Sequence, residues 1–164
     1  MKNFIICLFL FLFVTTVYSQ DVAFIKNVAN RVDIFVNEDE VQKYTDLEDI
    51  PELLFGSKII SNGFVIVTIY GSDFFLKKGQ GILIAKEPIT GEILVYQIKS
   101  SSSDDKIMVR INNHITTEMC QENILSFSRI GNTLKLKSVS GDLPITENGV
   151  VSNMFAGDYY YYKN

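Results

Sequence analysis

His114 and Cys120 are the residues whose types and spacing come closest to a catalytic pair. His114 is the only histidine in the chain, and an imidazole beside a thiol can generate the thiolate with which cysteine hydrolases attack a carbonyl group. No Gly-x-Ser-x-Gly elbow offers a serine nucleophile instead, and the run Asn112-Asn113-His114 is typical of a turn that follows a strand. We therefore expect a surface histidine, no catalytic residue and no enzyme, with a Cys120/His114 hydrolase as the remaining catalytic alternative.

Carboxylates would have to complete any metal site built on one histidine and one cysteine. The dense source of carboxylates is an acidic cluster made up of Glu38, Asp39, Glu40, Asp46, Glu48, Asp49 and Glu52. The cluster lacks the alternating aspartates and the loop glycine of an EF-hand. Gly79-Gln80-Gly81 likewise lacks the third glycine and the Lys-Ser/Thr pair of a phosphate-binding loop. We expect no metal and no other cofactor, with weak attraction of calcium to the acidic cluster left open.

Four consecutive tyrosines, Tyr159, Tyr160, Tyr161 and Tyr162, form the most unusual local feature. In a strand, alternate side chains point to opposite faces, so at least one pair of rings is expected to be partly exposed. Flat amphipathic rings of this kind bind protein partners or stack on sugars. The simpler interpretation is an edge strand whose tyrosines cover the core and direct their hydroxyl groups to water. These four residues are the predicted binding site.

Short apolar runs rich in valine, isoleucine and aromatic residues must position these side chains. Runs of this composition favour strands, and turn residues separate them at intervals of roughly ten residues. The stretch from Gly63 to Tyr70 is the most apolar of them, and it predicts a central strand covered on both faces. The expected strands are Val32–Val36, Gly63–Tyr70, Phe74–Leu76, Ile82–Ala85, Ile93–Ile98, Lys106–Ile111, Ile124–Ser128, Thr133–Lys137, Val150–Phe155 and Tyr159–Tyr162.

This pattern predicts an all-β fold: a single-domain sandwich, a jelly-roll-like domain or a short β-solenoid. At most one or two short helices are expected. Asn37 and Glu40 resemble a capping pair with apolar residues at helical spacing up to Leu47, and Thr117 to Asn123 could form one or two turns.

The N-terminal residues predict a secreted or periplasmic protein of the cell envelope. Lys2 precedes an apolar run, and the run ends in small or modest residues up to Ser19, which is the pattern of a secretory signal peptide. We expect cleavage after residue 19 and one β-rich domain over residues 20–164. The apolar run is shorter than a bilayer-spanning helix, and no later run is longer, so no membrane span is expected after cleavage. Loss of Cys7 with the signal peptide would leave Cys120 without an intramolecular partner, either buried or available to link two chains.

The net charge argues against one class of partner. The chain carries a formal net charge of −4 and has no block of basic residues. Binding to nucleic acid depends on clustered lysine and arginine, so no nucleic-acid partner is expected.

The order of turns and strands resembles a known family. A glycine-led turn at Gly56-Ser57 leads into an alternating strand from Val65 to Ile69, and Tyr70-Gly71-Ser72 then forms a turn before two short strands. Gly157-Asp158 forms a later turn before the tyrosines. Together these features resemble, loosely and over most of Val28 to Tyr162, the FecR-type domain of bacterial envelope proteins.

The resemblance implies an all-β, partly solenoidal or jelly-roll-like domain that acts by protein contact and has no catalytic residue. Ser57 stands where the family usually has aspartate, and Tyr70-Gly71-Ser72 stands where it has Asp-Gly-Ser. The cytoplasmic segment and transmembrane helix of the family's signal relays are missing, so the resemblance does not extend to sigma-factor regulation. From the residues and the resemblance we expect a non-enzymatic domain that binds another protein or self-associates, with carbohydrate binding on an aromatic β-face as the alternative.

Overall fold

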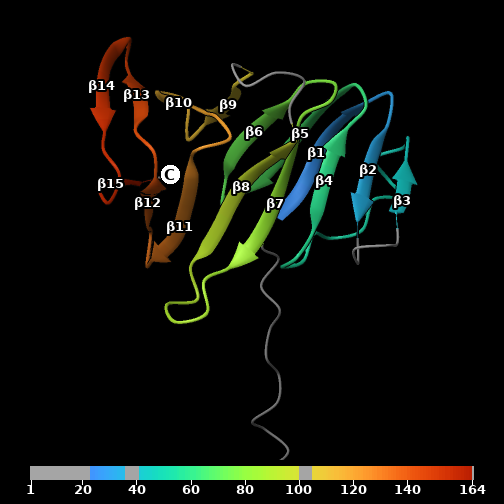
Figure 1. Ribbon diagram of the computed structural model, residues 1–164, viewed down its shortest axis with the longest axis horizontal. Helices are drawn as coiled ribbons and strands as arrows, with labels where there is room; N and C mark the ends of the chain where they lie inside the picture. The colour runs from blue at the N-terminus through green and yellow to red at the C-terminus, as the bar shows by residue number, and fades with distance from the viewer. Residues whose placement is uncertain (1–22, 36–40, 100–104, 164) are drawn as a thin grey trace, which may run out of the picture.

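A computed structural model describes residues 23–35, 41–99 and 105–163 (Figure 1). The predicted signal peptide, residues 1–19, lies outside the described residues. So do Asn37 and the part of the acidic cluster formed by Glu38, Asp39 and Glu40. Within the described ranges, no helix is long and apolar enough to cross a membrane.

The fold is a β-sandwich of two antiparallel sheets, which confirms the all-β prediction. We call the seven-stranded sheet A and the eight-stranded sheet B. In spatial order, sheet A consists of β1 (Ala23–Ala29), β5 (Phe64–Ile69), β6 (Ser72–Leu76), β9 (Ile107–Arg110), β10 (Ile115–Met119), β13 (Leu143–Glu147) and β14 (Val150–Met154). In spatial order, sheet B consists of β15 (Tyr159–Lys163), β12 (Thr133–Ser140), β11 (Ile124–Ile130), β8 (Ile93–Lys99), β7 (Gly81–Lys86), β4 (Lys58–Ser61), β2 (Val32–Phe35) and β3 (Val41–Tyr44).

The core lies between the sheets and is built from alternate residues of each strand. In β12, Leu134 and Leu136 are buried, while the lysines beside them in sequence point to the outer face. The rings of Phe74 from sheet A and Phe127 from sheet B meet edge to face, with their centroids 5.7 Å apart. Alternation of this kind is what a sheet with one buried face requires, because successive side chains of a strand point to opposite faces.

Two tight turns are set by residues with positive φ. Tyr70 and Gly71 (φ 47° and 83°) join β5 to β6, and Asn148 and Gly149 (φ 50° and 84°) join β13 to β14. Positive φ at both central positions is the type I′ geometry that matches the twist of a two-residue hairpin. The Asn148-Gly149 turn therefore holds β14 firmly against β13 at the end of sheet A.

The structure corrects three details of the expected fold. No helix is present within the described ranges: Val41–Tyr44 is strand β3, which pairs with β2, and Thr117–Met119 belongs to strand β10. Cross-strand pairing overrides the local helical spacing at both places. Strand β5 lies second from the edge of sheet A rather than at its centre. On its outer face Phe64 is exposed and Thr68 is buried, so this face is covered only in part.

The two open ends of the sandwich differ in their strands. One end carries the edge strands β1 and β3, and the other carries β14 and β15 (Figure 1). At the first end, the backbone N–H of Leu53 bonds to the carbonyl of Ala23 (3.2 Å), so the β3–β4 connection covers part of the β1 edge. We refer to the second as the β14–β15 end.

Candidate functional site

The tyrosine strand β15 is the edge strand of sheet B and pairs with β12. Alternation divides its four tyrosines into two pairs. Tyr159 and Tyr161 lie on the outer face and are 46% and 58% exposed, whereas Tyr162 is buried and Tyr160 is half-buried on the inner face. The four predicted residues thus have two different environments.

The outer pair forms a platform with lysines from the neighbouring strand. The rings of Tyr159 and Tyr161 lie with centroids 6.4 Å apart and planes 24° apart. The ammonium groups of Lys135 and Lys137 lie 4.1 and 5.0 Å from the centre of the Tyr159 ring, within the range of a cation–π contact. We call these four residues the Tyr–Lys platform.

A carboxylate anchors one lysine of the platform. Nζ of Lys135 lies 3.1 Å from Oε1 of Glu92, and both side chains are largely buried. Burial by itself raises the pKa of Glu92, but hydrogen bonds from Ser126 and Lys135 outweigh it and bring the pKa below its usual value. Burial likewise opposes the charge of Lys135, and the Glu92 partner more than compensates, so the pKa of Lys135 is raised. The lysine over Tyr159 is therefore held charged and in place.

The inner pair joins β15 to sheet A. The hydroxyl of Tyr162 lies 3.0 Å from Oγ of Ser72, and the hydroxyl of Tyr160 donates to Oε2 of Glu147 at 2.7 Å. Burial, together with the hydrogen bond to Glu147, raises the pKa of Tyr160 to about 12. These two tyrosines hold the sandwich together, so only Tyr159 and Tyr161 present a ring to the outside.

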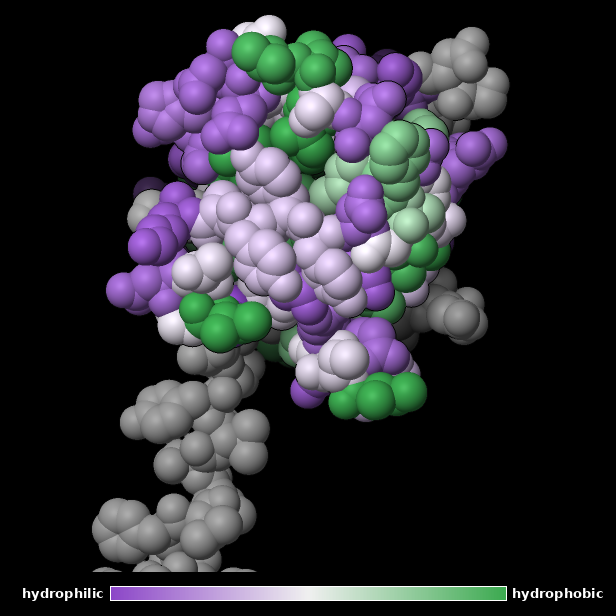
Figure 2. All heavy atoms as spheres, turned by 90° about the vertical axis from the view of Figure 1, so that its left-hand side faces the viewer, coloured by the Kyte–Doolittle hydropathy of each residue, from purple (hydrophilic) through white to green (hydrophobic). Residues whose placement is uncertain are grey.

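Strand β14, which lies at the same end of the sandwich as β15, exposes apolar side chains on both of its faces. Val150 and Val151 are 71% and 65% exposed, and no residue of Val150–Met154 is charged or a proline. Figure 2 looks onto this end of the sandwich, where hydrophobic (green) side chains lie at the surface among hydrophilic ones. Natural edge strands are commonly blunted by charge, proline or a bulge, so β14 is an unprotected edge.

Sequence reasoning predicted β14 as a strand but missed its exposure. Two consecutive valines after an Asn-Gly turn indicate a hairpin strand in any position of a sheet. The position of β14 at the edge of sheet A follows only from the pairing of all the strands, which no local pattern contains.

His114 and Cys120, the candidate catalytic pair, do not lie side by side. His114 is exposed in the turn before β10, and Cys120 follows the far end of that strand, so the strand's length separates them. Cys120 is half-buried, and its thiol lies 3.1 Å from Oδ1 of Asn123. No group of three or more histidine, cysteine, aspartate or glutamate side chains that could hold a metal occurs within the described ranges.

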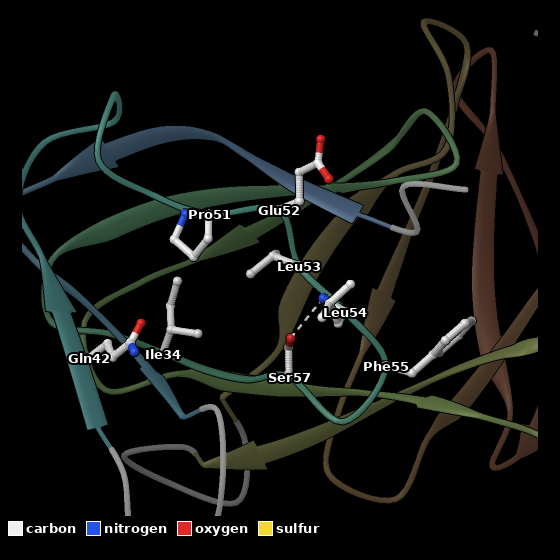
Figure 3. Close-up of a pocket in the computed structure, with 8 residues that line it drawn as sticks. All are labelled: Ile34, Gln42, Pro51, Glu52, Leu53, Leu54, Phe55 and Ser57. Carbon is white, nitrogen blue, oxygen red and sulfur yellow. Dashed lines mark hydrogen bonds between the residues drawn. The ribbon is translucent and has the colours of Figure 1, made fainter. Parts of the chain in front are cut away.

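A cleft of about 300 Å³ lies between the β3–β4 connection and strand β2 (Figure 3). Its lining consists of Ile34, Gln42, Pro51, Glu52, Leu53, Leu54, Phe55 and Ser57. Polar groups of this lining are already bonded within the chain, because Gln42 accepts from the Tyr44 hydroxyl and Oγ of Ser57 accepts from the backbone N–H of Leu54. The cleft thus offers an apolar wall rather than a catalytic arrangement.

A buried carboxylate on the outer face of sheet A forms a further ionic centre. Asp73 is 4% exposed and accepts hydrogen bonds from Thr68 (2.7 Å), Arg110 (2.5 Å) and Lys26 (3.3 Å). Burial raises the pKa of Asp73, but these hydrogen bonds outweigh it and hold the pKa below its usual value. With three donors in place, the carboxylate stabilises β1, β5, β6 and β9 rather than forming a site.

No protein-family model, curated protein or solved structure matches this chain. The resemblance to the FecR-type domain therefore stays a prediction.

Proposed function

We propose that this protein is a secreted or periplasmic, non-enzymatic binding module that contacts a protein partner through its β14–β15 end. The observation that carries the proposal is the exposed pair Tyr159 and Tyr161, held beside Lys135 and Lys137 on an edge strand. Tyrosine supplies a large contact area at a low cost in conformational entropy and is enriched in protein interfaces. The predicted signal peptide supports the location at the envelope or outside the cell.

Exposed apolar residues near the platform support the same end of the molecule. Val150, Val151 and Phe155 are all more than half exposed, and they lie on β14 and on the turn that leads into β15. Contiguous exposed apolar surface marks interaction sites in soluble proteins. An edge that is neither charged nor bulged also offers backbone groups to a partner.

The carbohydrate alternative is less well supported by this geometry. A sugar stacks on a free ring face, but Lys135 and Lys137 both lie over the ring of Tyr159. Protein partners make use of such cation–π pairs, since a carboxylate can approach the lysines while an apolar side chain packs on the rings.

Capture of a partner with surface variants tests the proposal. Immobilised protein is incubated with the secreted and envelope fractions of the producing cells, and bound proteins are compared between variants. The double change Tyr159→Ser and Tyr161→Ser should abolish capture of a specific protein, whereas Ile89→Ser should retain it. Ile89 is 92% exposed in the β7–β8 turn and serves as the matched control. Capture that is equal in both variants would overturn the proposal.

A further inference from the structure

Sheet A extends one strand beyond sheet B at the β14–β15 end. The hydroxyl of Tyr160 on β15 bonds to Glu147 on β13, and the hydroxyl of Tyr162 lies 3.0 Å from Oγ of Ser72 on β6. The inner side chains of β15 thus cross sheet A from β13 towards its middle, away from β14, and β14 lies outside them. Figure 1 shows β14 as the outermost strand on this side. Met154 is the buried residue of β14, and the other residues of the strand, Val150 to Asn153, are exposed.

The face of β14 that is turned towards sheet B carries exposed side chains. Directly opposed residues share a face, and the pairs are Leu143 with Met154, Ile145 with Ser152, and Glu147 with Val150. Leu143, Ile145 and Met154 are buried, so this is the face turned towards sheet B. Val150 and Ser152 are nevertheless exposed, because sheet B ends too early to cover them.

The free edge of β15 borders this uncovered face. Alternate backbone N–H and C=O groups of an edge strand point away from its neighbour and can pair with another strand. A strand added there would extend sheet B by one and would lie beneath β14. Its inward side chains would contact Val150 and Ser152, and its outward side chains would lie beside the Tyr–Lys platform. We call this position the β15 notch.

The charges around the β15 notch determine which outward side chains an added strand can carry. Lys135, Lys137 and Lys163 all lie on the outer face of β12 and β15. Glu92 pairs with Lys135, and within the described part of the chain no salt bridge engages Lys137 or Lys163. Carboxylates on an added strand would therefore meet ammonium groups, while lysines would be repelled.

A second copy of the chain does not fit the β15 notch. Pairing of β15 with its symmetry mate would place each β14 over the other copy's β15. The other copy's own sheet A already covers that β15, so each β14 would occupy the same space as a strand of the other copy's sheet A. The overhang therefore favours a single strand from a different molecule.

We infer, resting on the proposed function, that the partner contributes an extended segment that adds to β15 in the β15 notch, with acidic residues facing the Tyr–Lys platform and small apolar residues facing Val150. The segment spans about five residues, the length of β15. Binding then combines main-chain hydrogen bonds with alternate side-chain recognition.

Two synthetic peptides test this inference by NMR titration of the ¹⁵N-labelled protein. One alternates glutamate with valine, and the other alternates lysine with valine. The acidic peptide should shift the amide signals of Tyr159–Lys163, protect amides of β15 from exchange and give intermolecular contacts to the Val150 methyl groups. It should bind at least about tenfold more tightly than the basic peptide, and added salt should weaken it.

Adjacent valines provide the matched variants, because they have the same side chain and similar exposure on opposite faces of β14. Val150→Asp should weaken the acidic peptide about tenfold or more, and Val151→Asp should change its affinity less than about twofold. Equal effects of the two variants, equal binding of both peptides, or concentration-dependent dimerisation through β15 would each overturn the inference. If partner capture still depends on Tyr159 and Tyr161 in that case, the proposed function stands without the β15 notch; if it does not, the proposed function falls as well.

Discussion

The Tyr162 hydroxyl and Oγ of Ser72 lie 3.0 Å apart inside the sandwich, although ninety residues separate them in the chain. Ser72 begins β6 in sheet A, and Tyr162 lies in the last strand of sheet B. A single hydrogen bond thus ties the edge that carries the Tyr–Lys platform to the middle of the opposite sheet. The platform is held on a fixed edge for this reason.

Tyr162→Phe should lower the free energy of unfolding by about 1 kcal/mol, because it removes this bond and leaves the buried Ser72 hydroxyl without its tyrosine partner. Urea denaturation followed by circular dichroism measures the change. Tyr161→Phe, which alters an exposed hydroxyl, is the control and should leave the stability within about 0.5 kcal/mol of the unaltered protein. Equal effects of the two changes would contradict the structural role of Tyr162.

Alkaline pH should destabilise the protein through Tyr160. Its pKa is about 12 in the folded protein and 10.0 in the unfolded reference, so the folded state holds the proton more tightly. The stabilisation from this group is complete below pH 10 and is lost as the pH rises from 10 to 12. Tyr160→Phe should make the stability less dependent on pH over that interval. Absorbance titration of the phenols should at the same time lose one late-titrating group, and an unchanged titration would contradict the assignment.

Acid should destabilise the protein through Asp73. Its pKa lies below the reference value of 3.8, so the stabilisation is present above pH 3.8 and is lost as the pH falls below that value through the folded pKa. Asp73→Asn should cost about 1–2 kcal/mol at neutral pH and should make the stability less sensitive to acid below pH 4. Glu118→Gln, which breaks the exposed pair with Lys106, should cost less than about 0.5 kcal/mol. Thermal unfolding across pH 2–7 gives both values.

Neutral glycans should not bind in a way that depends on the tyrosine pair, because lysines cover one of its rings. A glycan array probed with the unaltered protein and with the double variant Tyr160→Ala and Tyr162→Ala, then with Tyr159→Ala and Tyr161→Ala, checks this expectation. A neutral sugar that binds the unaltered protein and loses affinity only with the second pair would restore the carbohydrate hypothesis.

Local patterns predicted much of the fold, because strand preference and turn chemistry are local. Each expected strand from Gly63–Tyr70 to Tyr159–Tyr162 corresponds to a strand of the structure, with ends that differ by up to three residues, since valine, isoleucine and aromatic runs favour a half-buried sheet. Strands β1, β4, β10 and β13 were not predicted, and Pro144 interrupts the pattern of β13. Strand β3 was misread because Val41 and Tyr44 fit a helical spacing as well as a pair with β2.

The site was only half predictable. The four tyrosines stand out in the sequence, and alternation alone divides them into two pairs. Which pair faces outward depends on the pairing with β12 and on the position of sheet A. The uncovered face of Val150 depends on the unequal extent of the two sheets, a long-range property that the spacing of residues does not carry.

The opposite end of the sandwich limits what can happen at the β14–β15 end. There β1 contains a register shift between Ile25 and Asn27, carries Lys26 between them and is partly covered by Leu53. Open-ended growth of a sheet from chain to chain needs a free edge strand at each end of that sheet. In sheet A, one of these edges, β1, is partly covered. Addition of strands to sheet A is therefore hindered at β1 and open at β14, so the two ends of this sheet differ in their capacity to pair with another chain.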